Sequence, residues 1–176
     1  MDAEEWPNVH GGEGSRLLVA AACVAAAGAL VAAYLAAYQV GVLGTVWDPV
    51  FGSNQSQRVL HSWFSEKLPI PDAALGAAGY LLELALVLLA LSSLKRPTAW
   101  HAGTTVLYGA LAIGMALGGL FLVGVQVFSL HAFCALCLLS AALSWALAVL
   151  AFPALVHGAR ALVANLHAFT ESRRGS

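Results

Sequence analysis

Two cysteines in the last third of the chain, Cys134 and Cys137, are separated by two residues. On a helix, residues three apart are neighbours on one face, and a Cα separation of about 5–6 Å suits a disulfide. A helix N-terminus also stabilises the thiolate that takes part in thiol–disulfide exchange. The spacing therefore predicts redox chemistry. The alternative is that both cysteines pack as small apolar side chains.

Other uses of these cysteines fit the sequence less well. A zinc site needs two more ligands, and the third cysteine, Cys23, is predicted to lie at the far end of another apolar stretch. Leu138 rather than histidine follows the pair, which argues against c-type haem attachment, so we expect no metal site. His131 precedes Cys134 by three residues. We expect it either to share the helical face of Cys134 and stabilise a thiolate, or to lie at the interface without a role.

The elements that position these cysteines follow from hydropathy. Of 176 residues, 60% are hydrophobic and only 10% are charged, whereas a soluble domain carries roughly 25% charged residues. Four apolar stretches reach the roughly 20 residues that a membrane span requires: 17–44, 73–94, 100–126 and 130–153. We predict an all-α integral membrane protein, a four-transmembrane-helix bundle in contact with lipid. A net charge of −1 without a basic stripe argues against a nucleic-acid partner.

The predicted organisation is a polar tail over 1–15, a membrane domain over 16–153 and an amphipathic tail over 154–176. A long exterior loop, about 45–72, joins the first two spans. Six of the eight lysines and arginines fall on the side of the two tails, and basic residues favour the cytoplasmic side. We therefore expect a multi-pass protein of the inner (plasma) membrane with both termini in the cytoplasm. The C-x-x-C then lies near the exterior face, where disulfides persist.

One acidic residue falls inside a span. Glu83 lies near the middle of the second apolar stretch, where an ionisable side chain is costly and often functional. We expect Glu83 to be protonated or bonded to Tyr80 or Gln126; a structural hydrogen bond between helices is the alternative. A transporter is disfavoured, because Glu83 is the one candidate intramembrane charge and no pair of broken helices is evident.

Three further features predict where helices begin, end and meet. Asp72 is predicted as the N-cap of the second span. Pro153 is predicted to end the fourth span, leaving the last tail on the membrane surface. Gly114 and Gly118 form a small-xxx-small pattern that predicts close packing between helices.

Three segments together resemble the vitamin K epoxide reductase family. They are LHAFCALCLLS over 130–140, VLHS over 59–62, and IPDAALG over 70–76 followed by Tyr80. The likeness covers roughly residues 40–152. It implies a bacterial-type membrane thiol–disulfide oxidoreductase. Such an enzyme oxidises thiols of exported or thioredoxin-like proteins and passes the electrons to a quinone, menaquinone or ubiquinone.

The resemblance also implies roles for individual residues. Cys137 is the catalytic cysteine beside the quinone, and Cys134 exchanges with the incoming thiol or disulfide. Ser62 matches a loop serine that shapes the catalytic site, and Asp72 falls where some members carry a quinone-bonding asparagine. The candidate quinone-binding residues are Cys137, Asp72, Tyr80 and Glu83.

The sequence departs from the family in its exterior loop. Members normally carry two further cysteines there, which shuttle electrons between the partner and the C-x-x-C, and this loop has none. Ser56 stands at the second position, and the first falls within 48–53. Serine cannot form a mixed disulfide. Three explanations stay open: a partner reduces Cys134 directly, a partner supplies a cysteine pair in trans, or the chain is a redox-inactive subunit or scaffold of a larger membrane complex.

Overall fold

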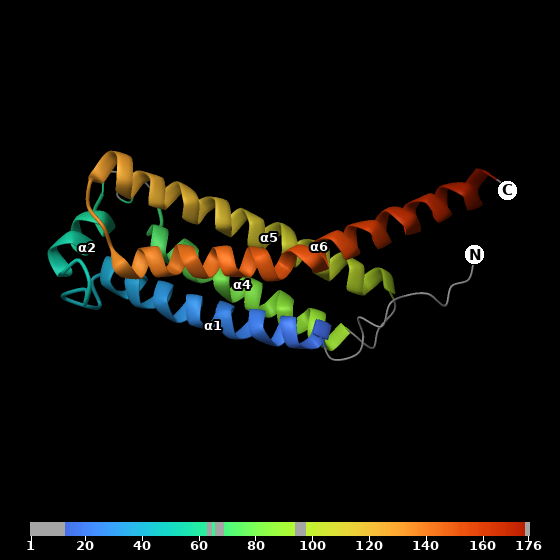
Figure 1. Cartoon of the computed structure of the whole chain (residues 1–176), viewed down its shortest axis with the longest axis horizontal. Coiled ribbons are helices and arrows are strands. Elements are labelled where there is room, and N and C mark those ends of the chain that lie inside the picture. The colour runs from blue at the N-terminus through green and yellow to red at the C-terminus, as the bar shows by residue number, and fades with distance from the viewer. Residues whose placement is uncertain (1–12, 63–64, 66–68, 94–97, 175–176) are drawn as a thin grey trace.

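The structure, a computed structural model, describes residues 13–62, 65, 69–93 and 98–174, and every regular element among them is helical. Four long helices run along one another (Figure 1). They are α1 (Glu13–Gln39), α4 (Asp72–Ser93), α5 (Thr98–Gly124) and α6 (Ala135–Arg174). A short helix, α2 (Ser53–Leu60), lies at one end, and a π-helical turn, η1 (Val125–Leu130), continues α5. The predicted all-α four-helix architecture is confirmed.

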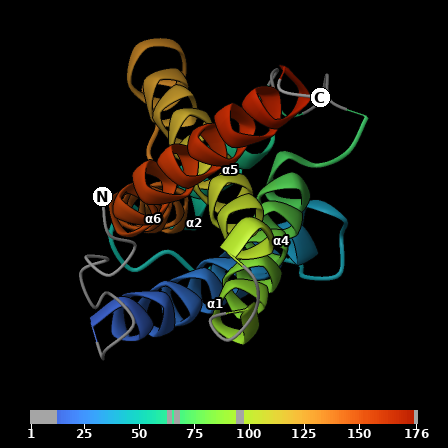
Figure 2. The same ribbon diagram turned by 90° about the vertical axis from the view of Figure 1, so that its right-hand side faces the viewer.

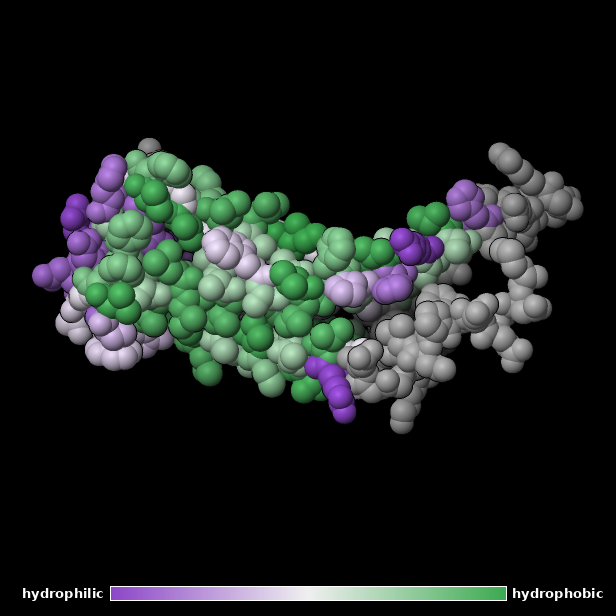
Figure 3. Space-filling view, in the orientation of Figure 1, coloured by the Kyte–Doolittle hydropathy of each residue, from purple (hydrophilic) through white to green (hydrophobic). Residues whose placement is uncertain are grey.

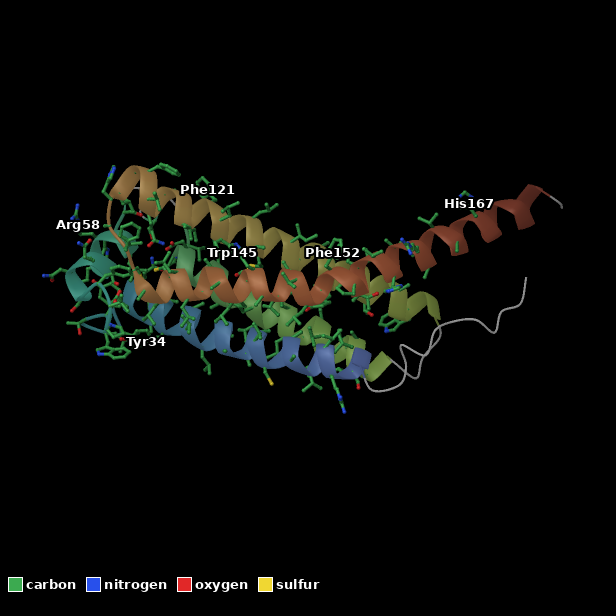
Figure 4. The ribbon with its side chains drawn as sticks, in the orientation of Figure 1. Tyr34, Arg58, Phe121, Trp145, Phe152 and His167 are labelled. Carbon is green, nitrogen blue, oxygen red and sulfur yellow. The ribbon has the colours of Figure 1, made fainter. Side chains whose placement is uncertain are left out.

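The outer surface of the bundle is apolar. Each long helix contains 21 to 30 residues that are apolar enough to cross a membrane, and less than a third of its most apolar stretch is buried inside the molecule. Figure 3 shows this surface as a green belt along the bundle, and Phe121 and Phe152 project from it in Figure 4. Only lipid can cover so much apolar surface around helices that satisfy their own backbone groups. The chain is a multi-pass membrane protein.

Small side chains let the helices approach in the core. Ala21, Ala25 and Ala29 recur on the buried face of α1, which packs against α4 and α6. A Cβ atom at Gly28 would overlap the ring of Tyr80, so this glycine makes the space that the buried tyrosine occupies.

The predicted close packing at Gly114 and Gly118 is wrong. No heavy atom lies within 4 Å of the position that a Cβ would take at either residue. Close approaches of α5 to α6 occur instead at Gly109, where a Cβ would lie 2.6 Å from the Cβ of Leu155, and at Gly119, where it would lie 3.3 Å from the Cα of Ala141. A small-xxx-small spacing permits close approach but does not select which face of the helix is used.

A connecting segment, residues 40–62, covers the bundle end opposite the start of α1 and the end of α6 (Figures 1 and 2). Val46 and Leu60 from this segment pack with Leu35 of α1 and with Cys134 in a second, smaller apolar cluster. The segment is therefore anchored on the bundle, and part of the predicted loop is helical.

Helix α6 differs from the prediction at both ends. The helix runs through Pro153 without a break, because a helix in a bundle tolerates the loss of one backbone N–H. Its first residue is Ala135, so Cys134 lies before the helix rather than one turn inside it. The cause is His131, whose φ of 47° places it in the left-handed region and separates η1 from α6.

Candidate active site

Cys134 occupies the N-cap position of α6. Its sulfur accepts a hydrogen bond from the backbone N–H of Cys137 at 3.2 Å, the usual pattern of an N-cap side chain. Its own backbone N–H donates to the side-chain oxygen of Gln126 at 3.0 Å, which fixes the end of η1 beside the start of α6. Cys134 is fully buried, Cys137 is partly exposed, and both are free thiols. The two sulfurs are thus neighbours at a helix N-terminus.

The surroundings of Cys134 favour its thiolate. The hydrogen bond with the side chain of Cys137 lowers the pKa of Cys134 from 9.0 to about 7, although burial acts in the opposite direction. Hydrogen bonds from the Ser56 hydroxyl and the Cys137 backbone also lower this pKa, and the charge of Asp48 raises it. A large share of Cys134 is therefore a nucleophilic thiolate at neutral pH.

Asp48 joins the connecting segment to the cysteine pair. Its Oδ2 accepts hydrogen bonds from the backbone N–H of Ala135 at 2.8 Å and from the Ser56 hydroxyl at 2.5 Å. Its Oδ1 accepts from the backbone N–H groups of Val50 and Phe51, both at 2.9 Å. Burial raises the pKa of Asp48, but these bonds outweigh it and set the pKa at about 2, so Asp48 is a carboxylate. The sequence analysis missed this residue as part of the site.

A cavity of about 340 Å³ is lined by Cys137 and by residues of all four long helices. Its polar lining residues are Asp72, Tyr80, Cys137, Ser140 and Ser144. The Tyr80 hydroxyl donates to the carbonyl of Ser140 and lies 2.7 Å from the hydroxyl of Ser144. Most of the remaining wall is apolar or glycine. A cavity of this size and lining suits a flat, mostly apolar molecule with a few polar atoms.

Residues 19–152, more than half of the chain, match the model of the Vitamin K epoxide reductase family. This chain belongs to the vitamin K epoxide reductase family. Among curated protein sequences, none matches the chain significantly. The family consists of membrane thiol–disulfide oxidoreductases linked to quinones, and the membership predicted from three short segments is confirmed.

Ser56, where other vitamin K epoxide reductases are expected to carry a loop cysteine, lies against the reactive sulfur. This residue of α2 is fully buried, and its hydroxyl, which donates to Asp48, lies close enough to Cys134 to lower the pKa of its thiol. A serine hydroxyl therefore lies beside Cys134 at the position where the resemblance predicts a cysteine.

Asp72 lines the cavity, but it does not cap its own helix as predicted. Its Oδ1 accepts hydrogen bonds from the Gln39 side chain at 2.5 Å and from the Ser65 hydroxyl at 2.7 Å. The other end of the Gln39 amide accepts from the backbone N–H of Ala73 at 3.1 Å. Gln39 of α1 therefore caps α4 and orients Asp72, a role that no local pattern around Gln39 indicates.

Two residues singled out from the sequence lie away from the cavity. Ser62 is buried in the connecting segment, where its hydroxyl accepts from the backbone N–H of Ser65 at 3.5 Å. It lines a separate recess with Arg58 and His61 at the α2 end. His131 is exposed and precedes the helix, so the expected face shared with Cys134 does not exist.

Glu83 is fully buried one turn beyond Tyr80 on α4, outside the cavity lining. Neither carboxyl oxygen has a hydrogen-bond partner among the residues that the structure describes. The expected bonds to Tyr80 and Gln126 are absent, because Tyr80 bonds to α6 and Gln126 bonds to the Cys134 backbone.

Proposed function

We propose that this chain is a membrane thiol–disulfide oxidoreductase in which Cys134 and Cys137 cycle between dithiol and disulfide and reduce a quinone, menaquinone or ubiquinone. One observation carries the proposal: Cys134 adjoins the connecting segment, whereas Cys137, hydrogen-bonded to it, lines a cavity inside the lipid-facing bundle. The pair therefore connects two places. One is a surface that a water-soluble thiol can approach, and the other is a cavity suited to a lipid-soluble ring.

The exchange half of the cycle takes place at Cys134. A partner thiolate attacks the Cys134 sulfur of the disulfide, and Cys137 leaves as a thiolate. A second partner thiolate then attacks the mixed disulfide at the partner's sulfur, which releases reduced Cys134 and leaves a disulfide in the partner. The low pKa of Cys134 makes it a good leaving group in this second attack.

The quinone half takes place at Cys137. A bound quinone accepts two electrons and two protons and is reduced to the quinol. Cys134 and Cys137 supply the two electrons as their disulfide forms again. Asp72, Tyr80 and Ser140 provide the polar atoms that would hold the ring oxygens, and Gly114 and Gly118 leave room along the wall.

Ser56 limits which thiol can react with Cys134. Because it cannot form a mixed disulfide, the incoming thiol has to come from another protein, such as an exported thioredoxin-like protein that supplies its own cysteine pair. Because Cys134 is fully buried, Ser56 and α2 must move aside when that thiol attacks.

The α2 end is proposed to face the exterior and the termini the cytoplasm. Arg58 lies at the α2 end (Figure 4). Arg16 is in the first turn of α1 and Arg160 is in the second half of α6, and these parts of the two helices lie toward the opposite end (Figure 1). Arginine and lysine near the ends of spans favour the cytoplasmic side.

Differential alkylation tests the proposal. Reduced protein in native membranes is mixed with ubiquinone-1 or menadione, quenched and labelled, and the three cysteines are quantified by mass spectrometry. We expect rapid loss of labelling at Cys134 and Cys137 and none at Cys23, which is exposed on α1 and is the internal control. The Cys137→Ala variant should lose the quinone-dependent change at Cys134. Thiols that stay fully labelled in the unmodified chain would refute the redox cycle.

A second candidate is a redox-inactive subunit of a larger membrane complex. The observation that favours it is Ser56 in contact with Cys134, where a relay cysteine would be needed. In that case Cys134→Ser and Cys137→Ser together should leave co-purification of the complex and its activity unchanged.

A further inference from the structure

Two polar side chains are buried in the middle of the bundle without partners. Glu83 of α4 and Tyr108 of α5 each have no exposed surface, and neither the carboxyl oxygens nor the phenol oxygen has a hydrogen-bond partner among the described residues. The two residues lie on helices that pack against each other. Such groups are rare inside proteins, since an unsatisfied buried polar atom is costly.

The surroundings of the pair are apolar. Glu83 and Tyr108 lie among a core cluster to which α1 contributes alanines and α6 contributes Leu147 and Ala151. The titratable members of this cluster are the two tyrosines, Tyr80 and Tyr108. No lysine, arginine or histidine is among the buried residues that the structure describes, and burial without a countercharge favours the neutral, protonated form of the Glu83 carboxyl group.

The pair lies on a line of buried polar groups that leads to the cavity. Tyr80, one turn before Glu83 on α4, reaches α6 with its hydroxyl, and both Ser140 and Ser144 there line the cavity. Thr105, one turn before Tyr108 on α5, is buried farther along the bundle, toward the end where α5 begins. Buried polar residues thus recur three positions apart on α4 and on α5, in a core that is otherwise largely apolar.

We propose that Glu83, together with Tyr108, is a proton-relay site that supplies the cavity beside Cys137 from within the membrane. This inference rests on the proposed function. Glu83 acts through Tyr80 and the two serines, with buried water completing the hydrogen bonds of the carboxyl and phenol groups. An ionisable side chain inside a membrane span is commonly part of such a relay.

The proposed step balances as follows. Disulfide formation releases two electrons and the two thiol protons, and quinol formation consumes two electrons and two protons. Glu83 gives one of these two protons to the cavity through Tyr80 and regains one through Tyr108 from the end where α5 begins. One thiol proton in turn leaves to water at the α2 end. No additional oxidant or reductant is needed.

Infrared difference spectroscopy of the full-length protein in nanodiscs tests this relay. We expect a protonated carboxyl band that shifts when ubiquinone-1 is added and again during turnover with dithiothreitol. The band should be absent in Glu83→Gln, retained in Glu83→Asp and displaced in Tyr108→Phe. The Ser92→Ala variant is the control, because Ser92 lies exposed on the same helix and its hydroxyl donates to the carbonyl of Leu89, one turn earlier.

Kinetics separate a relay from a structural role. Glu83→Gln keeps the size of the side chain and should slow quinone reduction at least about tenfold, with partial rescue in Glu83→Asp. A carboxyl band that does not shift when ubiquinone-1 is added, or an unchanged rate of quinone reduction in Glu83→Gln, would overturn the relay. If the unmodified protein reduces no quinone with any dithiol, the proposed function fails. The response of the band to ubiquinone-1 then still decides whether Glu83 serves the cavity.

Discussion

The Oδ2 atom of Asp48 accepts a hydrogen bond from the backbone N–H of Ala135 at 2.8 Å, across 87 residues of chain. Ala135 is the first residue of α6, so its N–H has no partner within the helix. The carboxylate satisfies this N–H, lies at the positive end of the helix and binds Ser56 at the same time. Asp48 thus adds polar links between the connecting segment and the cysteine-bearing helix to the apolar packing of Val46 and Leu60.

Replacing Asp48 should loosen this junction. Asp48→Ala removes a helix cap and leaves the buried Ser56 hydroxyl without its carboxylate partner, which predicts a loss of about 1–2 kcal/mol in the free energy of unfolding. Thermal unfolding of the purified protein in a fixed detergent measures the change. Asn54→Ala, an exposed change on neighbouring α2, should leave the midpoint within error. Equal midpoints for both variants would contradict the role of Asp48.

The reactivity of Cys134 should depend on pH around neutrality. With a pKa of about 7, its thiolate fraction rises from about 10% at pH 6 to about 90% at pH 8. The rate of Cys134 alkylation by iodoacetamide should increase between pH 6 and pH 8. Mass spectrometry measures this rate under conditions in which α2 is displaced from Cys134 to the same extent at each pH. Because the Cys137 side chain contributes most to the lowered pKa, Cys137→Ala should shift the midpoint upward, toward the ordinary value of 9.0.

The control for this profile is Cys23→Ala, which removes the one thiol outside the pair. The pH midpoint of Cys134 alkylation in this variant should equal that of the unmodified chain. A midpoint that stays near 7 in Cys137→Ala would contradict the contribution of the Cys137 side chain to the lowered pKa.

Ser56→Cys should rebuild a disulfide to the reactive cysteine. The Ser56 hydroxyl already lies close to Cys134, so a thiol at this position needs only small movements to form a bond. Mild oxidation followed by peptide mapping should find a link between residues 56 and 134. Asn54→Cys places a thiol on the same short helix in an exposed position and should form no such link. A Ser56→Cys chain whose only disulfide is Cys134–Cys137 would count against the contact.

The features that depend on the local pattern of residue types could be predicted from the sequence. Lipid demands about 20 apolar residues for each span, so the four helices follow directly from composition along the chain. The positions of Cys137, Asp72 and Tyr80 around one cavity were anticipated through the family resemblance. Asp48 and Gln39 were missed because each caps a helix distant in sequence, and such pairing has no local signature.

Two errors have a similar origin. Cys134 was placed inside a helix because nothing in the residue type of His131 requires a left-handed backbone, which uncommonly falls on residues other than glycine. Gly114 and Gly118 were assigned to helix packing because small residues serve equally to let helices touch and to leave space for a ligand. Only the arrangement of the neighbouring helices distinguishes the two uses.

Filling this space should weaken quinone binding. A Cβ atom at Gly118 would meet no neighbouring residue within 4 Å, and Gly118 lines the cavity, so a larger side chain there takes up cavity space. Gly118→Leu should therefore raise the KM for ubiquinone-1 about tenfold, a loss of about 1.4 kcal/mol of binding, while alkylation of the reduced cysteine pair stays unchanged. Gly103→Leu is the matched control, since Gly103 has equally open surroundings on α5 but lies outside the cavity. If both variants raised KM alike, the effect would come from α5 as a whole; an unchanged KM in Gly118→Leu would place the quinone elsewhere in the bundle.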